Sequence, residues 1–288
     1  MAVYDIDGTE LTALRDNKSV NIRRAYDIDG NPVFAKMLKV ASYNVGGWYD
    51  GTGTNVPDAK ANAYLKMQND TLENVNADII CLEEFWTYFS GTTKAYNAIL
   101  SNFYPYYHSA NGSNQYFGRC ICSKFPMSDY AQHSFANEAN RYYDEVTVDV
   151  NGVQIHVFVT HLSGSSDRQV RIDQAKEIHD YIAAQGYERY IVFGDFNVSM
   201  VSPMSDYNVD VFGSFLEDGC ELANGGTFGV LETYSRNSIY DDNLAVDNII
   251  ISDAFTAQST GIDLTKVTFQ ATNGDKIDHI PLIADISI

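Results

Sequence analysis

Short apolar segments that end in turn-forming residues recur from about residue 37 to the end of the chain. They are rich in Val and Ile and end at Gly, Asn, Asp or Pro, which is typical of β-strands. The segments that we expect to form strands are residues 38–45, 77–85, 117–125, 145–150, 153–162, 189–197, 246–252 and 281–288. Residues 145–150 alternate strictly, and Asn151 and Gly152 join them to the next segment, which is a strong hairpin signal. The predicted sheet is therefore at least partly antiparallel.

Two segments between these strands carry residues at helical spacing. The first has the i, i+3, i+4, i+7 pattern at Tyr96, Ile99, Leu100 and Phe103. The second has a similar stripe at Arg171, Ala175, Ile178 and Ile182. The chain therefore combines strands and helices in one domain.

The first 36 residues differ from the rest, because the pentapeptide YDIDG occurs in them twice, at 4–8 and at 26–30. Each copy ends in an Asp-Gly turn signal. A calcium loop that begins at Asp27 lacks the Glu that an EF-hand needs at its twelfth position, which is Leu38. We therefore expect residues 1–36 to form an appendage of short strands and residues 37–288 to form the main domain.

The 288 residues include 19 Lys and Arg against 38 Asp and Glu, so the formal net charge is −19. Such a field repels polyanions, which excludes a non-catalytic nucleic-acid scaffold but allows an enzyme whose bound cations reverse the local charge. No apolar stretch is long enough to span a membrane. The N-terminus shows no signal-peptide pattern, so we expect a chain that is cytoplasmic or secreted after removal of a leader. The four cysteines are predicted to be buried thiols.

Polar residues interrupt the ends of the predicted strands. They are Asn44, Glu83, Glu84, His161, Asp195, Asn197, Asp247, Asp278 and His279. A single residue of this kind is usually a turn former, but in a mixed sheet the ends of several strands meet at one edge, where such a set can converge. The set is rich in oxygen and contains no cysteine, which favours a hard cation such as Mg²⁺ over zinc. Two histidines beside such a cation indicate phosphoric-ester hydrolysis.

Six motifs follow one another along the chain: ASYNVGG (41–47), DIICLEE (78–84), VTHL (159–162), GDFN (194–197), AVDNIIIS (245–252) and DHIPL (278–282). In this order they resemble the endonuclease/exonuclease/phosphatase superfamily, the group built on the deoxyribonuclease I fold. The resemblance covers about residues 37–288. It implies an α/β (α+β) fold, a four-layered sandwich of two packed mixed sheets flanked by helices.

The resemblance also implies a metal site. Glu84 and Asp278 match metal-binding acids, and Asn44 matches an amide that holds the metal or the scissile phosphate. Glu83 stands where the family usually has Gln, so an added negative charge is expected beside the metal. The implied cofactor is Mg²⁺, with Mn²⁺ or Ca²⁺ as alternatives.

The catalytic residues are implied in the same way. Asp195 and Asn197 match the pair that orients the attacking water and the phosphate, and His279 matches the catalytic imidazole, oriented and charged by Asp247. His161 matches a second histidine of many branches and, with Asn44 and Asn197, is expected to contact the substrate. Whether Asp195 or His279 acts as the base stays open at this point.

Two substrate classes fit this pattern. A lipid enzyme needs an exposed apolar segment, and the candidate at 85–89 directly follows the metal acid, which suits a cleft wall better. A nuclease needs basic residues beside the cleft. The residues available for this purpose are Arg119, Lys124, Arg141 and Arg168. We therefore expect a metal-dependent phosphodiester hydrolase that prefers nucleic acid to phospholipid.

Two alternatives stay open. One is a sphingomyelinase-like phosphodiesterase or a phosphatase of the same family. The other is a catalytically silent binding module, which would have lost one of the residues named above. None of Glu84, His161, Asp195, Asn197 and His279 is missing, which favours the enzyme.

Overall fold

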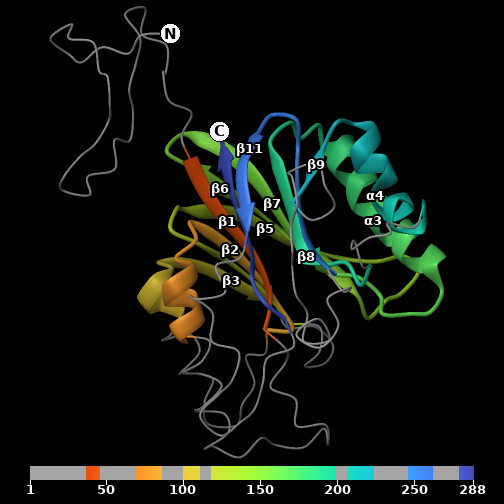
Figure 1. Ribbon diagram of the computed structural model, residues 1–288, viewed down its shortest axis with the longest axis horizontal. Coiled ribbons are helices and arrows are strands. Elements are labelled where there is room, and N and C mark those ends of the chain that lie inside the picture. The colour runs from red at the N-terminus through yellow and green to blue at the C-terminus, as the bar shows by residue number, and fades with distance from the viewer. Residues whose placement is uncertain are drawn as a thin grey trace, which may run out of the picture.

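The computed structural model describes residues 37–45, 69–85, 100–110, 118–198, 206–223, 246–261 and 279–288. Within these residues the chain forms two six-stranded sheets (Figure 1). The strand order is β11–β12–β1–β2–β4–β3 in the first sheet and β5–β6–β7–β8–β10–β9 in the second. The predicted appendage at residues 1–36 and Asp278 of the predicted metal site lie outside the described residues.

The elements have the following bounds. The first sheet contains β1 (Met37–Asn44), β2 (Ile79–Glu83), β3 (Tyr106–Ala110), β4 (Arg119–Ser123), β11 (Thr256–Gly261) and β12 (Leu282–Ser287). The second contains β5 (Met127–Ser134), β6 (Tyr142–Val150), β7 (Val153–His161), β8 (Tyr190–Asp195), β9 (Glu221–Leu222) and β10 (Asp247–Ile251). The helices α3 (Arg168–Gln185) and α4 (Asp206–Glu217) follow β7 and β8.

Both sheets are mixed, as the sequence predicts. β1 and β2 run parallel, and so do β7 and β8, whereas the other neighbouring strands are antiparallel. The predicted hairpin joins β6 to β7, and its turn residues Asn151 and Gly152 have φ values of 54° and 92°. A two-residue type I′ turn requires these left-handed conformations, so the hairpin prediction is confirmed.

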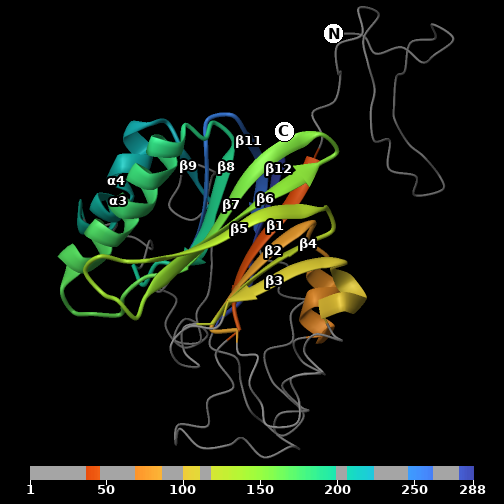
Figure 2. The same cartoon turned by 180° about the vertical axis from the view of Figure 1, so that it is seen from behind.

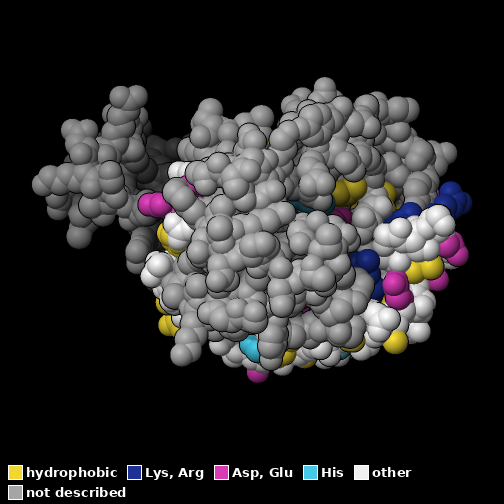
Figure 3. Space-filling view, turned by 90° about the horizontal axis from the view of Figure 1, so that it is seen from below, with side chains coloured by type: hydrophobic (Ala, Val, Ile, Leu, Met, Phe, Trp, Pro, Cys, Tyr) yellow, Lys and Arg dark blue, Asp and Glu magenta, His cyan; other side chains and the backbone are white. Residues whose placement is uncertain are grey.

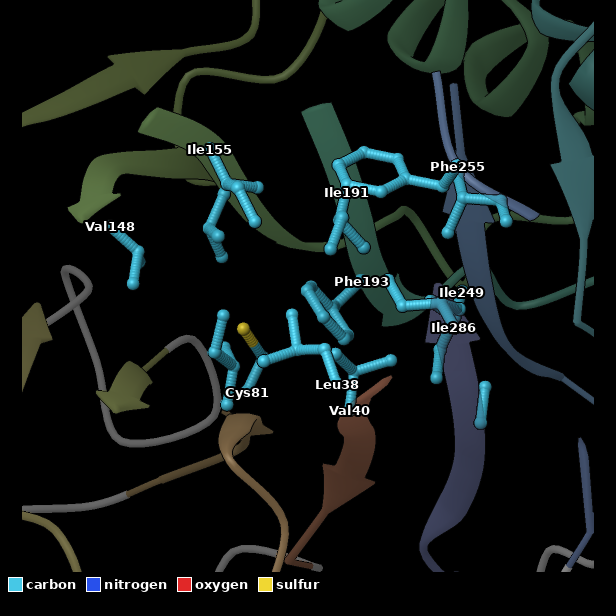
Figure 4. Close-up of a cluster of buried hydrophobic side chains, with 14 of the residues drawn as sticks. Leu38, Val40, Cys81, Val148, Ile155, Ile191, Phe193, Ile249, Phe255 and Ile286 are labelled. Atoms are coloured by element: carbon cyan, nitrogen blue, oxygen red, sulfur yellow. The ribbon is translucent and has the colours of Figure 1, made fainter. Parts of the chain in front are cut away.

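The centre of the molecule is an apolar layer between the two sheets. Side chains alternate along each strand, so every second residue points into this layer. Leu38 and Val40 of β1 meet Phe193 of β8 and Ile249 of β10 there, and all four are fully buried (Figure 4). Removing this apolar surface from water holds the sheets face to face.

Helices cover the outer faces of both sheets. Residues 69–75 and 100–103 are helical, and Leu72 and Leu100 pack on the outer face of the first sheet (Figure 2). α3 and α4 cover the outer face of the second sheet, where Ile178 and Phe212 are buried (Figure 1). The four-layered sandwich expected from the sequence is therefore confirmed.

Local sequence signals define α3. Its N-cap is Asp167, whose side chain accepts the backbone N–H of Gln169 at 3.0 Å, and its C-cap is Gly186 with a φ of 70°. The four residues of the predicted stripe lie on its buried face, which Gln174 joins. In the other predicted stripe, Tyr96 and Ile99 lie outside the described residues.

Two further expectations, on membrane-spanning segments and on the cysteines, can be compared with the described residues. Among the described helices, none has the length and hydropathy that crossing a membrane requires. All four cysteines are buried free thiols, as predicted. Cys120 and Cys122 lie on one face of β4, with their Sγ atoms 3.5 Å apart.

Candidate active site

Three neighbouring strands of the second sheet place polar side chains at one edge. Asp195, at the end of β8, is paired by register with His161 of β7 on one side and with Asp247 of β10 on the other. All three face the first sheet, because the residues two positions away along the same strands belong to the intersheet layer. Strand register alone therefore brings these predicted residues side by side.

Gly194 permits this close arrangement. A Cβ at this position would collide with the backbone carbonyl oxygen of Thr160 on the neighbouring strand. Any larger residue would therefore push β7 away from β8 at the point where His161 and Asp195 meet. The Gly in the GDFN motif is explained by this contact.

The first sheet supplies the other half of the site. Asn44 ends β1 and is paired by register with Glu83 of β2, and Glu84 follows directly. The Nδ2 atom of Asn44 donates to Oε1 of Glu84 at 3.3 Å and, across the gap between the sheets, to Oδ2 of Asp195 at 3.0 Å. His279 lies three residues before β12 of the same sheet. The site is therefore assembled from both sheets.

Asp195 is the carboxylate around which the site is organised. Its Oδ1 atom accepts the backbone N–H of Asn197 at 2.8 Å. Its Oδ2 atom lies 3.6 Å from Nε2 of His161 and 3.9 Å from Nε2 of His279. Because Asp195 is only 3% exposed, these contacts hold its oxygens in one orientation.

Two residues beside Asp195 have backbone conformations that are uncommon without glycine. The φ values of Glu84 and Asn197 are 50° and 53°. Asn197 is further fixed by its side-chain amide, which donates to the carbonyl oxygen of Leu162 at 2.8 Å. Backbone strain of this kind clusters at functional sites, which agrees with the predicted roles of both residues.

Asp247 and His279 form a hydrogen-bonded pair. Nδ1 of His279 is 2.9 Å from Oδ2 of Asp247, and the side chains are 12% and 1% exposed. The pair leaves Nε2 as the ring atom that faces Asp195. An imidazole oriented by a buried carboxylate on one nitrogen and open to reactants on the other is suited to proton transfer.

The two histidines of the site differ in charge. Burial lowers the pKa of His161 to about 3 in spite of the nearby Asp195, so this imidazole is neutral at pH 7. Burial also acts to lower the pKa of His279, but the charge and hydrogen bond of Asp247, with Asp195 and Glu84, raise it to about 10. In the protein without bound metal, His279 is therefore an imidazolium ion.

The structure corrects one expectation about charge. The sequence indicates an added negative charge at Glu83, yet this residue is fully buried. Ser42 donates to its Oε1 at 3.0 Å, and its Oε2 has no hydrogen-bond partner among the described residues. Burial, and next the charge of Asp247, raise the pKa of Glu83 well above its ordinary value. These effects favour the neutral carboxylic acid, which is closer to the Gln that the family usually has.

The donor set fits a divalent cation. Glu84, Asn44 and Asp195 offer oxygen ligands within one connected cluster, and ligand atoms of Asp195, Asp247 and His279 lie within 4.8 Å of one another. Oxygen ligands are the ones that Mg²⁺ and other hard cations prefer. A bound cation also offsets the mutual repulsion of carboxylates that are shielded from water.

Of the four basic residues expected to be available to phosphates, the structure places one at the site. Arg141 donates through Nη1 to the carbonyl oxygen of His161 at 3.1 Å, and its side chain is 12% exposed. Arg119 is instead buried in an ion pair between the sheets. Lys124 follows the opposite end of β4, and Arg168 begins α3. The expectation that Arg119 is available to a phosphate is therefore wrong.

The structure brings together all the predicted site residues that it describes. They are Asn44, Glu84, His161, Asp195, Asn197, Asp247 and His279. Their chemical roles stay predictions. Sequence reasoning missed the contacts of Ser42 with Glu83 and of Arg141 with His161, because neither Ser42 nor Arg141 lies at the polar end of a predicted strand.

Comparison with models of protein families supports the resemblance that the six sequence motifs indicate. A model of the Endonuclease/Exonuclease/phosphatase family matches residues 41–279. The match begins in β1 and ends at His279, so it contains both halves of the site. It excludes only the first 40 and the last 9 residues.

Curated relatives match shorter stretches. Phospholipase C of Staphylococcus aureus is 29% identical over 102 residues, which cover 30% of this chain and 31% of that protein. A putative neutral sphingomyelinase of Caenorhabditis elegans is 26% identical over 142 residues, which cover 42% of this chain and 32% of that protein. The chain thus matches about a third of the length of these relatives.

The fold has close structural counterparts. Truncated TDP2 of Caenorhabditis elegans superimposes with a TM-score of 0.62 at 19% identity, covering 88% of this chain and 98% of that chain. Sphingomyelinase C of Streptomyces griseocarneus superimposes with a TM-score of 0.59 at 17% identity, covering 86% and 99%. At these identities the similarity establishes the fold alone.

Proposed function

Because the chain belongs to the endonuclease/exonuclease/phosphatase family, whose members hydrolyse phosphoric esters, we propose that it cleaves a phosphodiester bond by attack of water on phosphorus. The observation that carries this proposal is the position of Asp195. Its Oδ2 atom lies within 4 Å of Asn44 in β1, His161 in β7 and His279 shortly before β12, so both sheets contribute. Such convergence on one buried carboxylate is expected of a catalytic centre.

The metal and its ligands are part of the proposal. Glu84 and Asn44 would hold a divalent cation, for which Mg²⁺ is the first choice and Mn²⁺ or Ca²⁺ the alternatives. When bound, the cation stabilises the negative charge that develops on the phosphoryl oxygens. Asp278 remains a further predicted ligand.

The proton transfers fall to Asp195 and His279. Asp247 holds Nδ1 of His279, so Nε2 is free to exchange a proton within 3.9 Å of Asp195. The attacking water gives up a proton to this pair as its oxygen bonds to phosphorus, and the pair returns a proton to the alkoxide as the bond between phosphorus and the alcohol oxygen breaks. His161 and Asn197 lie beside Asp195 and would orient the phosphate through neutral hydrogen bonds.

For the substrate we propose a phospholipid headgroup diester. The relatives matched by sequence are named phospholipase C and neutral sphingomyelinase. Of the four candidate basic residues only Arg141 lies at the site, and basic side chains on the described part of the lower face lie beside acidic ones (Figure 3). A protein that follows a nucleic-acid backbone needs several unpaired cations along its path.

Nucleic acid is the second candidate substrate, and it is the one that the sequence favours. In this case Arg141, whose Nη1 atom donates to the backbone carbonyl of His161 beside Asp195, would meet one further phosphate next to the scissile one. The preference for a nuclease stays a prediction on this basis.

The test offers both substrates to one preparation. Purified protein would be incubated with Mg²⁺, and separately with EDTA, on sphingomyelin or phosphatidylcholine vesicles and on supercoiled plasmid. We expect Mg²⁺-dependent release of phosphocholine that His279→Ala abolishes and His179→Ala retains, because His179 of α3 pairs with Asp218, which directly follows α4 in the outer layer. Plasmid nicking with the same dependence would identify the nuclease instead. Inactivity on both substrates and on phosphate monoesters would refute the hydrolase.

A further inference from the structure

One buried ion pair crosses between the sheets beside the active site. Arg119 begins β4 of the first sheet, Asp144 lies in β6 of the second, and Nε of the Arg donates to Oδ2 of the Asp. Their side chains are 1% and 2% exposed. Both face the intersheet layer, because Ile121 and Val146, two positions further along the same strands, belong to it. The pair is therefore a polar link through the centre of the sandwich.

The contacts of this pair are directional. Oδ1 of Asp144 accepts the hydroxyl of Tyr130 at 3.1 Å and the amide of Gln132 at 3.0 Å, both from β5. The guanidinium carbon of Arg119 lies 5.5 Å from the centre of the Tyr142 ring. Hydrogen bonds and guanidinium–ring contacts tolerate little change in distance and angle. Apolar attraction, by contrast, has no direction, so the apolar layer opposes small shifts of one sheet along the other only through the fit of its side chains.

Such shifts matter because the site is divided between the sheets. The first sheet supplies Asn44 and Glu84, whereas the second supplies His161 and Asp195. The hydrogen bond from Asn44 to Asp195 at 3.0 Å connects these halves directly, and the pair of His279 and Asp247 at 2.9 Å is a second connection between the sheets. A displacement of about 1 Å can cost about 10²-fold in rate when reacting groups must be aligned.

The ion pair is anchored next to both halves. Arg119 is paired by register with Glu83, the residue before Glu84. Asp144 is paired by register with Val159, two residues before His161. Each end of the link is thus one strand away from a residue of the site.

We propose that Arg119 and Asp144 are positioning residues, which keep the Asn44–Glu84 half of the active site in register with the His161–Asp195 half. This inference rests on the proposed function, because it concerns the geometry of the same site. A stabilising role alone explains the pair poorly, since the cost of removing two charges from water offsets most of their attraction. Two apolar residues of similar volume would stabilise this position as well, without fixing its geometry.

The experiment replaces the pair by apolar residues. Arg119→Met and Asp144→Leu would be made singly and together in the full chain. The matched control is Lys124→Met, which removes the partly exposed contact to Asp78 at the opposite end of β4. For each protein the melting temperature, kcat, KM and the Mn²⁺ dissociation constant would be measured, the last by electron paramagnetic resonance without substrate.

We expect the single variants to melt lower than the wild type, because each leaves one buried charge without its partner. The double variant should melt close to the wild type. Its kcat should nevertheless stay about 10²-fold low with little change in KM, and it should bind Mn²⁺ about 10-fold more weakly. Lys124→Met should keep kcat and Mn²⁺ affinity.

In each of three situations, one result would overturn the inference. A double variant that regains both the melting temperature and kcat would show that the pair is only structural. If the double variant does not fold, the single variant Arg119→Met, assayed below its melting temperature, removes the link, and wild-type kcat in this variant would overturn the inference. If the wild type hydrolyses nothing, the proposed function fails separately, and unchanged Mn²⁺ affinity in the double variant would then overturn the role of the pair.

Discussion

Removing the charge of Asp247 tests the electrostatics of the site most directly. Asp247→Asn keeps the shape of the side chain but removes the negative charge 2.9 Å from Nδ1 of His279. Coulomb's law with an effective dielectric constant of about 20 gives about 6 kcal/mol for unit charges at this distance. The pKa of His279 is about 10 against an ordinary 6.5, and this difference corresponds to about 5 kcal/mol between the protonated and neutral forms. Burial is the largest influence on His279 and acts in the opposite direction, so the attraction of Asp247 must also offset this penalty, and the smaller contributions of Asp195 and Glu84 add to it.

We therefore expect the pKa of His279 in metal-free Asp247→Asn to fall from about 10 towards or below 6.5, because burial then acts against a weaker opposing charge. Histidine ring nitrogen shifts, followed by NMR in EDTA, measure this value directly. The chain has only six histidines, and His279→Ala assigns the signal. His161 is an internal control, because burial lowers its pKa to about 3 and it should stay neutral.

The same change has a consequence for stability. A group whose pKa is raised by folding stabilises the folded state at pH values below its pKa in the unfolded chain. This contribution disappears as the pH rises through its pKa in the folded protein. The wild type should therefore lose its advantage over metal-free Asp247→Asn between about pH 6.5 and about pH 10. At pH 7.5 with Mg²⁺ the variant should lose about 10²- to 10⁴-fold in kcat. A wild-type pKa near 6.5, or an unchanged pKa in the variant, would refute this reasoning.

Three further predictions follow from other contacts. Mg²⁺ at 100 times its Kd should raise the free energy of unfolding of the wild type by about 2.7 kcal/mol. Glu84→Gln should remove most of this rise, which thermal unfolding with and without Mg²⁺ measures. An equal rise in both proteins would exclude Glu84 as a ligand. Gly194→Ala should cost about 1–3 kcal/mol because its Cβ meets the Thr160 carbonyl, whereas Gly213→Ala, with open space around its Cβ, should not. Glu83→Gln should leave kcat nearly unchanged, and a large loss would show that Glu83 acts as a charged group.

The fold could be predicted wherever burial leaves a pattern in the sequence. β2, β4 and β8 are buried on both faces and appear as continuous apolar runs. β5 was missed, because it is an edge strand with mostly exposed or half-buried side chains, so it shows no apolar period. A register shift between Ser128 and Ala131 interrupts what alternation it has.

The site could be predicted as a set of residues but not as an arrangement. Asp195, His161 and Asp247 are recognisable as polar ends of apolar strands, yet nothing in the chain order shows that β8 lies between β7 and β10. The link from Arg119 to Asp144 left no signal at all, because its partners lie in different sheets. From the sequence, Arg119 is therefore expected to be a cation that is available to a phosphate.

Glu83 shows why residue types alone do not determine the charge of a site. In the sequence it is a second acid beside Glu84, which doubles the expected negative charge at the metal. In the structure the two neighbours point to different environments, because the side chain of Glu84 is 24% exposed and Glu83 is fully buried. Burial penalises the ionised form of Glu83, and the nearby Asp247 adds to this penalty. The adjacent glutamates thus differ: Glu84 is the accessible acid that we propose as a metal ligand, whereas burial favours the neutral form of Glu83, and the substitution of Glu83 by Gln tests that difference.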